Sequence, residues 1–250
     1  MIRKEELVRI ADAKKLSMKN AEKDYLLELL LFAIFSESGD SLLFKGGTAL
    51  YKFYSLNRFS EDLDFTINKR RVDIEKVVQV ALRRLSALGI EGKSDMEKYG
   101  NEINARLLFK GPLYNGSKES MAYVAINCSL REKPIAAKKE LFVPFYREIP
   151  SFDVFVMGAE EILAEKVRAI YSRNKARDVY DIWFLIKRGV APDMRMIEKK
   201  LKVCKLSFSK KAFAEKLEEK SGLFVPDLSG LIMGELPDFK KIKAEVLKKF

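Results

Sequence analysis

The sequence predicts an α+β fold in which a sheet with flanking helices comes first and a region of helices comes last. Strand-like apolar runs are confined to residues 1–157, whereas residues 158–250 have apolar side chains at helical spacing. A second observation is a glycine pair, Gly46-Gly47, between a short apolar run and an amphipathic helix. The third is an acidic pair, Asp62 and Asp64, in a segment with strand-like alternation. Together they predict a sheet-containing core followed by a helical region.

Helices are expected where apolar residues recur every three or four positions. Residues 22–35 show this spacing in a nearly continuous apolar run, so their helix is expected to pack behind the core. Residues 72–88 repeat the pattern with charged residues on the other side, as in a helix that connects two strands. Further on, Gly189 and Pro192 end a helix. The expected helices are residues 22–35, 48–54, 72–88, 159–172, 175–187, 212–219 and 239–250.

Strands are expected in short apolar or alternating runs that end at turn residues. Gly111-Pro112 and Asn115-Gly116 separate two such runs, which we expect in the same sheet as the acidic strand. No internal repeat or low-complexity linker interrupts the pattern. The expected strands are residues 41–44, 62–65, 104–109, 123–130 and 154–157.

The glycine pair predicts a phosphate-binding corner. Gly46-Gly47 lies between an apolar strand and the helix that follows Thr48. A helix N-terminus presents backbone N–H groups and the positive end of the helix dipole, which favour an anion. We therefore expect Gly46, Gly47 and Thr48 to hold phosphate oxygens, and Ser60 to assist them.

The acidic pair predicts a metal site beside that corner. Side chains of a strand alternate between faces, so Asp62 and Asp64 point the same way, ~6.5–7 Å apart along the chain. Hard cations such as Mg²⁺ or Mn²⁺ take oxygen ligands and complete their shell with substrate phosphates. A lone pair of this kind is more often a solvated strand face, but the nearby glycine corner favours a site for a metal ion and phosphates.

The composition narrows the chemistry. The chain contains no histidine, which excludes Ser–His and Cys–His nucleophiles, imidazole bases and zinc sites with histidine ligands. Its two cysteines, Cys128 and Cys204, form neither a disulfide framework nor a four-cysteine zinc site, and they suit a reducing cytoplasm. Carboxylates, lysines and hydroxyl groups must therefore carry any catalysis.

The net charge of +11 at pH 7, from 47 basic and 36 acidic residues, favours a polyanionic partner such as a nucleic acid or a nucleotide. The most apolar stretch, residues 25–35, is interrupted by Glu28 and is too short to span a bilayer. It also lacks the features of a secretory signal. We expect a cytoplasmic protein with no membrane interaction.

Four segments together resemble the AbiEii/AbiGii toxin family of nucleotidyltransferase-like proteins. They are Lys45–Leu50 (KGGTAL), Arg58–Phe65 (RFSEDLDF), Glu160–Ala169 (EEILAEKVRA) and Arg177–Asp181 (RDVYD). The resemblance covers most of the chain, although the N-terminal helix and the C-terminal part match only in character. It implies a nucleotidyltransferase-like core with a mixed sheet flanked by helices, and an added helical region that completes the active-site cleft. It also implies the toxin of a toxin–antitoxin or phage-defence pair, with the antitoxin encoded nearby.

The helices after residue 158 contribute further candidates. Lys166 and Arg173 are seven residues apart and lie on one helix face. Asp178 and Asp181 are three apart and share a face of the next helix. From spacing alone, a surface lysine and salt bridges with Arg173 or Arg177 explain them. The resemblance instead implies that Lys166 acts on the triphosphate, and that Asp178 or Asp181 completes the metal shell, orients the lysine or acts as a base.

Asn127 departs from the usual nucleotidyltransferase pattern. Such enzymes often take a third carboxylate from a later strand, and the candidate strand here offers Asn127 at that place. An asparagine can coordinate a cation through its carbonyl oxygen but brings no charge. The identity of the general base therefore stays open.

The expected function is transfer of a nucleotide from a nucleoside triphosphate to an RNA hydroxyl. Asp62 and Asp64 would bind Mg²⁺, and Lys166, with Arg58 or Arg173, would neutralise the phosphates. The resemblance alone implies that the acceptor is the 3′ end of a tRNA. Two alternatives remain: a kinase of the same fold that transfers a γ-phosphate to RNA or protein, and a weakened module that binds nucleotide or RNA without catalysis.

Overall fold

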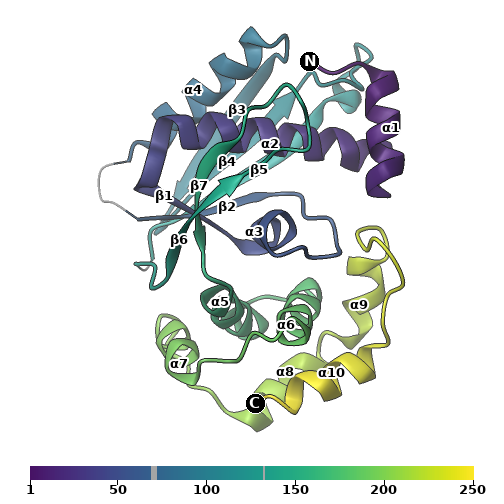
Figure 1. Ribbon diagram of the computed structural model, residues 1–250. Coiled ribbons are helices and arrows are strands. Elements are labelled where there is room, and N and C mark those ends of the chain that lie inside the picture. The colour runs from purple at the N-terminus through teal and green to yellow at the C-terminus, as the bar shows by residue number, and fades with distance from the viewer. Residues whose placement is uncertain (69–71, 132) are drawn as a thin grey trace. The chain divides into compact units, whose positions relative to one another are not determined.

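The computed structural model describes residues 1–68, 72–131 and 133–250 (Figure 1). The chain divides into two compact units. Unit 1 comprises Met1–Ala49 and Phe59–Met157, and unit 2 comprises Leu50–Arg58 and Gly158–Phe250. The chain therefore enters unit 2 briefly, between the glycine corner and the acidic strand, before it completes unit 1.

Unit 1 is an α/β unit built on one mixed sheet. Its helices are α1 (Lys4–Lys14), α2 (Met18–Ser38), the first residues of α3 (Gly46–Phe53) and α4 (Ile74–Ala87). Its strands are β1 (Leu42–Lys45), β2 (Leu63–Ile67), β3 (Gly92–Tyr99), β4 (Glu102–Phe109), β5 (Ala122–Ser129), β6 (Ala137–Phe142) and β7 (Phe152–Met157). Within the described residues the strand order is β3-β4-β5-β2-β1-β7-β6. The β1–β7 and β2–β5 pairs are parallel and the other pairs are antiparallel.

The core of unit 1 lies between the sheet and its long helices. The helix α2 is capped by the Ser17 side chain, which accepts a hydrogen bond from the Asn20 amide, and it is buried along most of its length. It packs against β5, β7 and α4, while α4 packs against β3. The side chains of Leu63 and Phe65 in β2 are fully buried, whereas Asp64 between them is partly exposed. One face of the sheet is thus apolar and covered by helices, and the acidic strand turns its polar side the other way.

Unit 2 is helical. It contains α5 (Ala159–Ser172), α6 (Arg177–Lys187), α7 (Met194–Lys202), α8 (Lys210–Glu218), α9 (Ser221–Leu228), α10 (Phe239–Leu247) and the segment Leu50–Arg58. The helix α5 packs against α6, α7 and α8, and α10 packs against α6 and α8. Side chains of Asp193, Ser209 and Asp238 accept backbone hydrogen bonds at the starts of α7, α8 and α10.

The predicted fold class is confirmed, and the elements with strong periodicity lie where they were expected. The structure adds the strands β3 and β6 and the helices α1, α7 and α9, for which no bounds were predicted. Both added strands are edges of the sheet and are rich in charged residues. None of the helices formed by the described residues combines the length and the apolar character that crossing a membrane requires.

Candidate active site

The glycine corner brings the start of α3 against the acidic strand. β1 ends at Lys45 and α3 begins at Gly46, whose φ of 77° lies in the left-handed region. A Cβ on Gly46 would stand 2.3 Å from Oδ2 of Asp64, so no other residue fits here without displacing that carboxylate. In the sheet, Lys45 lies directly opposite Asp64. Gly46 is thus the residue that allows the N-terminus of α3 and Asp64 to meet.

The two aspartates differ in their backbone setting. Asp64 lies within β2, whereas Asp62 comes just before its first residue, and both side chains are partly exposed. The hydroxyl of Thr48, which is fully buried in α3, donates a hydrogen bond of 2.5 Å to the backbone carbonyl of Asp62. Ser60, also predicted to bind phosphate, is buried. The Thr48 hydroxyl therefore fixes the acidic segment to α3.

Asn127 lies beside Asp64 on the neighbouring strand. The parallel pairing of β2 and β5 sets the two residues directly opposite each other. The amide Nδ2 of Asn127 donates a hydrogen bond of 3.0 Å to Oδ1 of Asp64. The side chain of Asn127 thus holds the carboxylate of Asp64 in place.

This donor set fits a hard divalent cation that is held jointly by the protein and its substrate. Asp62, Asp64 and the carbonyl oxygen of Asn127 are oxygen ligands of the kind that Mg²⁺ prefers. Across residues 1–68, 72–131 and 133–250, no three acidic, histidine or cysteine side chains are grouped to hold a metal ion on their own. The remaining ligands would have to come from water and from phosphates at the adjacent helix N-terminus.

Unit 2 holds the other group of predicted residues in a buried ion network. Lys166 of α5 has its Nζ 2.8 Å from Oδ1 of Asp178 and 2.7 Å from Oδ2 of Asp181, both on α6. The two aspartates are fully buried, and Lys166 is only 6% exposed. Lys166 is therefore no solvated surface lysine, since its ammonium group lies between two carboxylates.

Two arginines complete the network. Arg58, from the segment before β2, binds Asp181 in a bidentate manner, with its Nε and Nη2 each 2.7 Å from a carboxylate oxygen. Arg173, at the end of α5, donates from Nε and Nη2 to Asp178 at 2.7 and 2.8 Å. Arg58 is buried, whereas the Arg173 side chain is 55% exposed. Every oxygen of the two carboxylates therefore contacts a cation.

The electrostatics of the network keep both aspartates ionised. Burial by itself raises the pKa of Asp178, but Lys166 and Arg173 outweigh burial and hold the pKa well below its ordinary value. Burial likewise raises the pKa of Asp181, but the charges of Arg58 and Lys166 lower it by more, so the pKa of Asp181 is also below its ordinary value. Burial lowers the pKa of Arg58 too, but Asp181 more than compensates, so the pKa is raised.

Sequence reasoning missed the residues that fix Arg58 in place. Tyr180 of α6 donates a hydrogen bond of 2.6 Å from its hydroxyl to Oδ1 of Asn57. Arg58 itself forms an isolated β-bridge with Ile232, next to the hydrogen bond from the Met233 amide to the Asn57 carbonyl. These partners are more than a hundred residues away in sequence, so no local pattern signals them.

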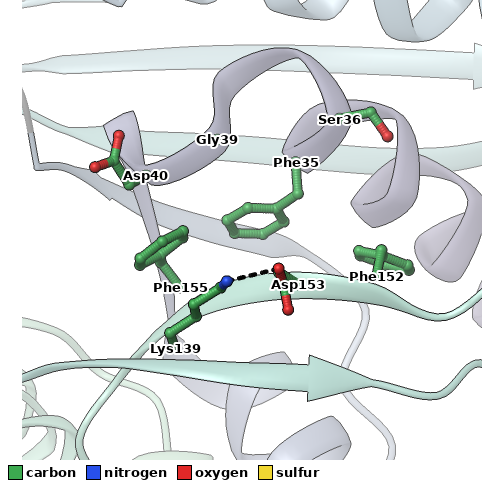
Figure 2. Close-up of a pocket in the computed structure, with 8 residues that line it drawn as sticks. All are labelled: Phe35, Ser36, Gly39, Asp40, Lys139, Phe152, Asp153 and Phe155. Carbon is green, nitrogen blue, oxygen red and sulfur yellow. Dashed lines mark ion pairs between the residues drawn. The ribbon is translucent and has the colours of Figure 1, made fainter.

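A pocket of about 350 Å³ in unit 1 is distinct from these groups (Figure 2). Its walls include Phe35 of α2 and Phe152 and Phe155 of β7. At its rim, Lys139 of β6 pairs with Asp153 at 2.8 Å (Figure 2). None of the residues predicted for nucleotide chemistry lines it.

Comparisons with known proteins agree with the predicted fold. A family model described as nucleotidyl transferase AbiEii toxin, type IV TA system, matches residues 29–245. MenT4, a nucleotidyltransferase toxin from Mycobacterium tuberculosis, is 19% identical with a TM-score of 0.70, over 100% of this chain and 89% of that chain. A proposed nucleotidyltransferase from Helicobacter pylori is 21% identical with a TM-score of 0.63, over 94% of each chain. No curated protein matches the chain. At these identities the solved structures establish the nucleotidyltransferase fold.

Proposed function

This chain belongs to the AbiEii nucleotidyl transferase toxin family of type IV toxin–antitoxin systems, and from that premise we propose that it moves a nucleotide from a nucleoside triphosphate to an RNA, with the 3′ end of a tRNA as the acceptor. Family membership implies a triphosphate substrate and a cognate antitoxin. The observation that supports the proposal most strongly is the close approach of the glycine corner to Asp64, which puts a phosphate-binding helix end beside a carboxylate pair.

We assign the triphosphate and the metal to this corner. The backbone N–H groups of Gly46 and Gly47 bind phosphate oxygens, and Thr48 keeps Asp62 in position through its hydrogen bond. Asp62 and Asp64, with Asn127 beside them, would hold Mg²⁺ or Mn²⁺. When bound, such an ion would neutralise phosphate charge and orient the triphosphate.

Within unit 2, we assign Asp178 and Asp181 to the positioning of Lys166 and Arg58, the cations that the family resemblance implies for the triphosphate. The two aspartates are buried, their oxygens contact cations, and their pKa values are lowered. Those properties suit a residue that fixes a lysine, not one that accepts a proton.

The proposed reaction needs positioning more than covalent chemistry. The RNA hydroxyl attacks the α-phosphorus in line, a new P–O bond forms, and the bond to the β-phosphate oxygen breaks. Pyrophosphate leaves, and the hydroxyl proton passes to water. Fixed donors and cations around the phosphates are enough to accelerate such a step.

Label transfer tests the proposal directly. The purified protein is incubated with total cellular RNA and Mg²⁺, using each nucleoside triphosphate labelled either at the α- or at the γ-phosphate. We expect the α-label to enter RNA and the γ-label to remain in pyrophosphate. Transfer of the γ-label to RNA or protein would instead establish the kinase alternative, and binding without any transfer would establish the non-catalytic one.

A further inference from the structure

A row of polar side chains crosses the sheet of unit 1. The strand registers set Lys45 opposite Asp64, Asp64 opposite Asn127, Asn127 opposite Asn104, and Asn104 opposite Glu97. Residues directly opposite each other on neighbouring strands point to the same face, with ~4.8 Å between strands. The row therefore extends from Asp64 across β5 and β4 to the edge strand β3.

This face is open over β5 and β4. The side chains of Ala105 and Leu107 are buried, whereas Asn104 is partly exposed and Arg106 is exposed, with 60% of its side chain accessible. On β5, Tyr123 is 41% exposed and belongs to the same face as Asn127. Since α2 packs against β5 and α4 against β3 on the apolar side, the polar side of these strands is the exposed one.

The in-line geometry of the proposed reaction indicates from which side the acceptor hydroxyl approaches. An in-line displacement needs the attacking hydroxyl and the leaving pyrophosphate on opposite sides of the α-phosphorus. The glycine corner follows β1, on one side of β2, while Asn127 and Asn104 lie on the other side. With the phosphates at Gly46 and Gly47, an approach of the hydroxyl from the side of β5 and β4 meets this requirement.

We infer that Asn104 and Arg106 of β4 bind the terminal nucleotides of the RNA acceptor, an inference that rests on the proposed function. No side chain among the described residues hydrogen-bonds to the Asn104 amide, whose donor and acceptor suit the edge of a base or a ribose hydroxyl. Arg106 and Tyr123 offer planar groups on which an unpaired base stacks.

The charges of the face favour bases and ribose over phosphates. Asp95 lies directly opposite Arg106 on the neighbouring strand. Oε2 of Glu97 lies 3.6 Å from Nη2 of Arg106. Together with Asp64, these carboxylates repel a phosphate backbone but not a neutral base. The face therefore suits the nucleoside end of a single-stranded RNA, while the phosphates further along the RNA need a basic surface elsewhere.

Steady-state kinetics with bulk tRNA and α-labelled triphosphate test this inference. We expect Asn104→Ala and Arg106→Ala each to raise the KM for RNA by about tenfold. The KM for the triphosphate should stay within about twofold, because these side chains bind only the acceptor and not the triphosphate. Arg84→Ala is the matched control, since Arg84 is an exposed arginine on α4, which packs against the apolar face. This variant should leave both KM values unchanged.

Two outcomes separate the inference from the function on which it rests. An unchanged KM for RNA in both β4 variants, alongside loss of transfer in Asp64→Asn, would overturn the acceptor assignment and leave the proposed function standing. No transfer to RNA by the wild-type protein would overturn the proposed function and the inference with it. Circular dichroism of each variant confirms that a raised KM does not come from unfolding.

Discussion

At the scale of a single residue, Gly46 allows the N-terminus of α3 and the Asp64 carboxylate to lie close together. Its positive φ turns the chain from β1 into α3, and its missing side chain leaves room for the Asp64 carboxylate. The turn and the close approach place separate demands on one position, and only glycine meets both. The helix end and the carboxylate therefore depend on the same residue.

We expect Gly46→Ala to reduce nucleotide transfer by more than tenfold and to destabilise unit 1 by about 1–3 kcal/mol, because the added Cβ meets Asp64 and the backbone is strained. Initial rates and urea unfolding measure the two effects. Gly222→Ala is the control, since a Cβ there meets open space and its φ is not positive. Wild-type activity in Gly46→Ala would show that the corner does not shape the site.

The ion network of unit 2 joins three chain segments at the scale of elements. Lys166 comes from α5, Asp178 and Asp181 from α6, and Arg58 from the segment that leads into β2. A buried charge without its partner costs several kcal/mol, so each member depends on the others. The network therefore fixes the packing of α5 on α6. It also holds Arg58, which lies four positions before Asp62 in the sequence.

Asp181→Asn should destabilise the protein by about 3–5 kcal/mol, because it leaves Arg58 and Lys166 in a buried setting without their full counter-charge. The matched control is Asp153→Asn, which removes an exposed partner of Lys139 and should cost less than about 1 kcal/mol. Urea denaturation measures both changes. Equal, small losses would mean that the network contributes little to stability.

The network also predicts how stability depends on pH. The folded-state pKa values of Asp178 and Asp181 lie below the ordinary value of 3.8. Their contribution to stability is therefore complete above that value and is lost as the pH falls through the lower folded-state values. The Asp181→Asn variant should lose less stability than the wild type between about pH 5 and pH 2, as measured by urea midpoints at each pH. Parallel curves for the two proteins would contradict this origin of acid sensitivity.

Sequence periodicity predicted the elements whose burial is one-sided or complete. The helix α2 and the strand β5 have strong apolar patterns and were expected. The edge strands β3 and β6 were not, because their residues are largely exposed and charged and leave little alternation to detect. The pairing of Asp64 with Asn127 depends on strand order across sixty-three residues, which no local pattern encodes.

The charge is unevenly distributed at the scale of the whole molecule. Unit 2 has 23 basic and 14 acidic residues, whereas unit 1 has 24 basic and 22 acidic residues. Most of the net charge of +11 thus belongs to the helical unit, where Lys240, Lys241, Lys248 and Lys249 are exposed near the C-terminus. Unit 2 is therefore the part of the chain best suited to bind an RNA backbone.

We expect RNA affinity to fall steeply with salt, with a log–log slope that changes by roughly 0.7–0.9 for each phosphate that the protein neutralises. Replacing the four exposed C-terminal lysines by glutamine should weaken binding and flatten this slope. The control replaces four exposed lysines of unit 1, namely Lys4, Lys15, Lys19 and Lys76, and makes the same change in net charge. Fluorescence anisotropy with labelled tRNA measures both slopes, and equal slopes would exclude a specific basic surface on unit 2.

Metal-dependent transfer through the acidic pair is tested most directly by single-turnover transfer of α-label to RNA by the wild type and by the Asp62→Asn/Asp64→Asn variant. We predict that the variant loses transfer by about 10²–10³-fold or more, because the phosphates lose their cation. Without Mg²⁺ its unfolding temperature should equal or exceed that of the wild type, since repulsion between neighbouring carboxylates is removed. Full transfer by a folded double variant would contradict the assignment of Asp62 and Asp64 to the metal.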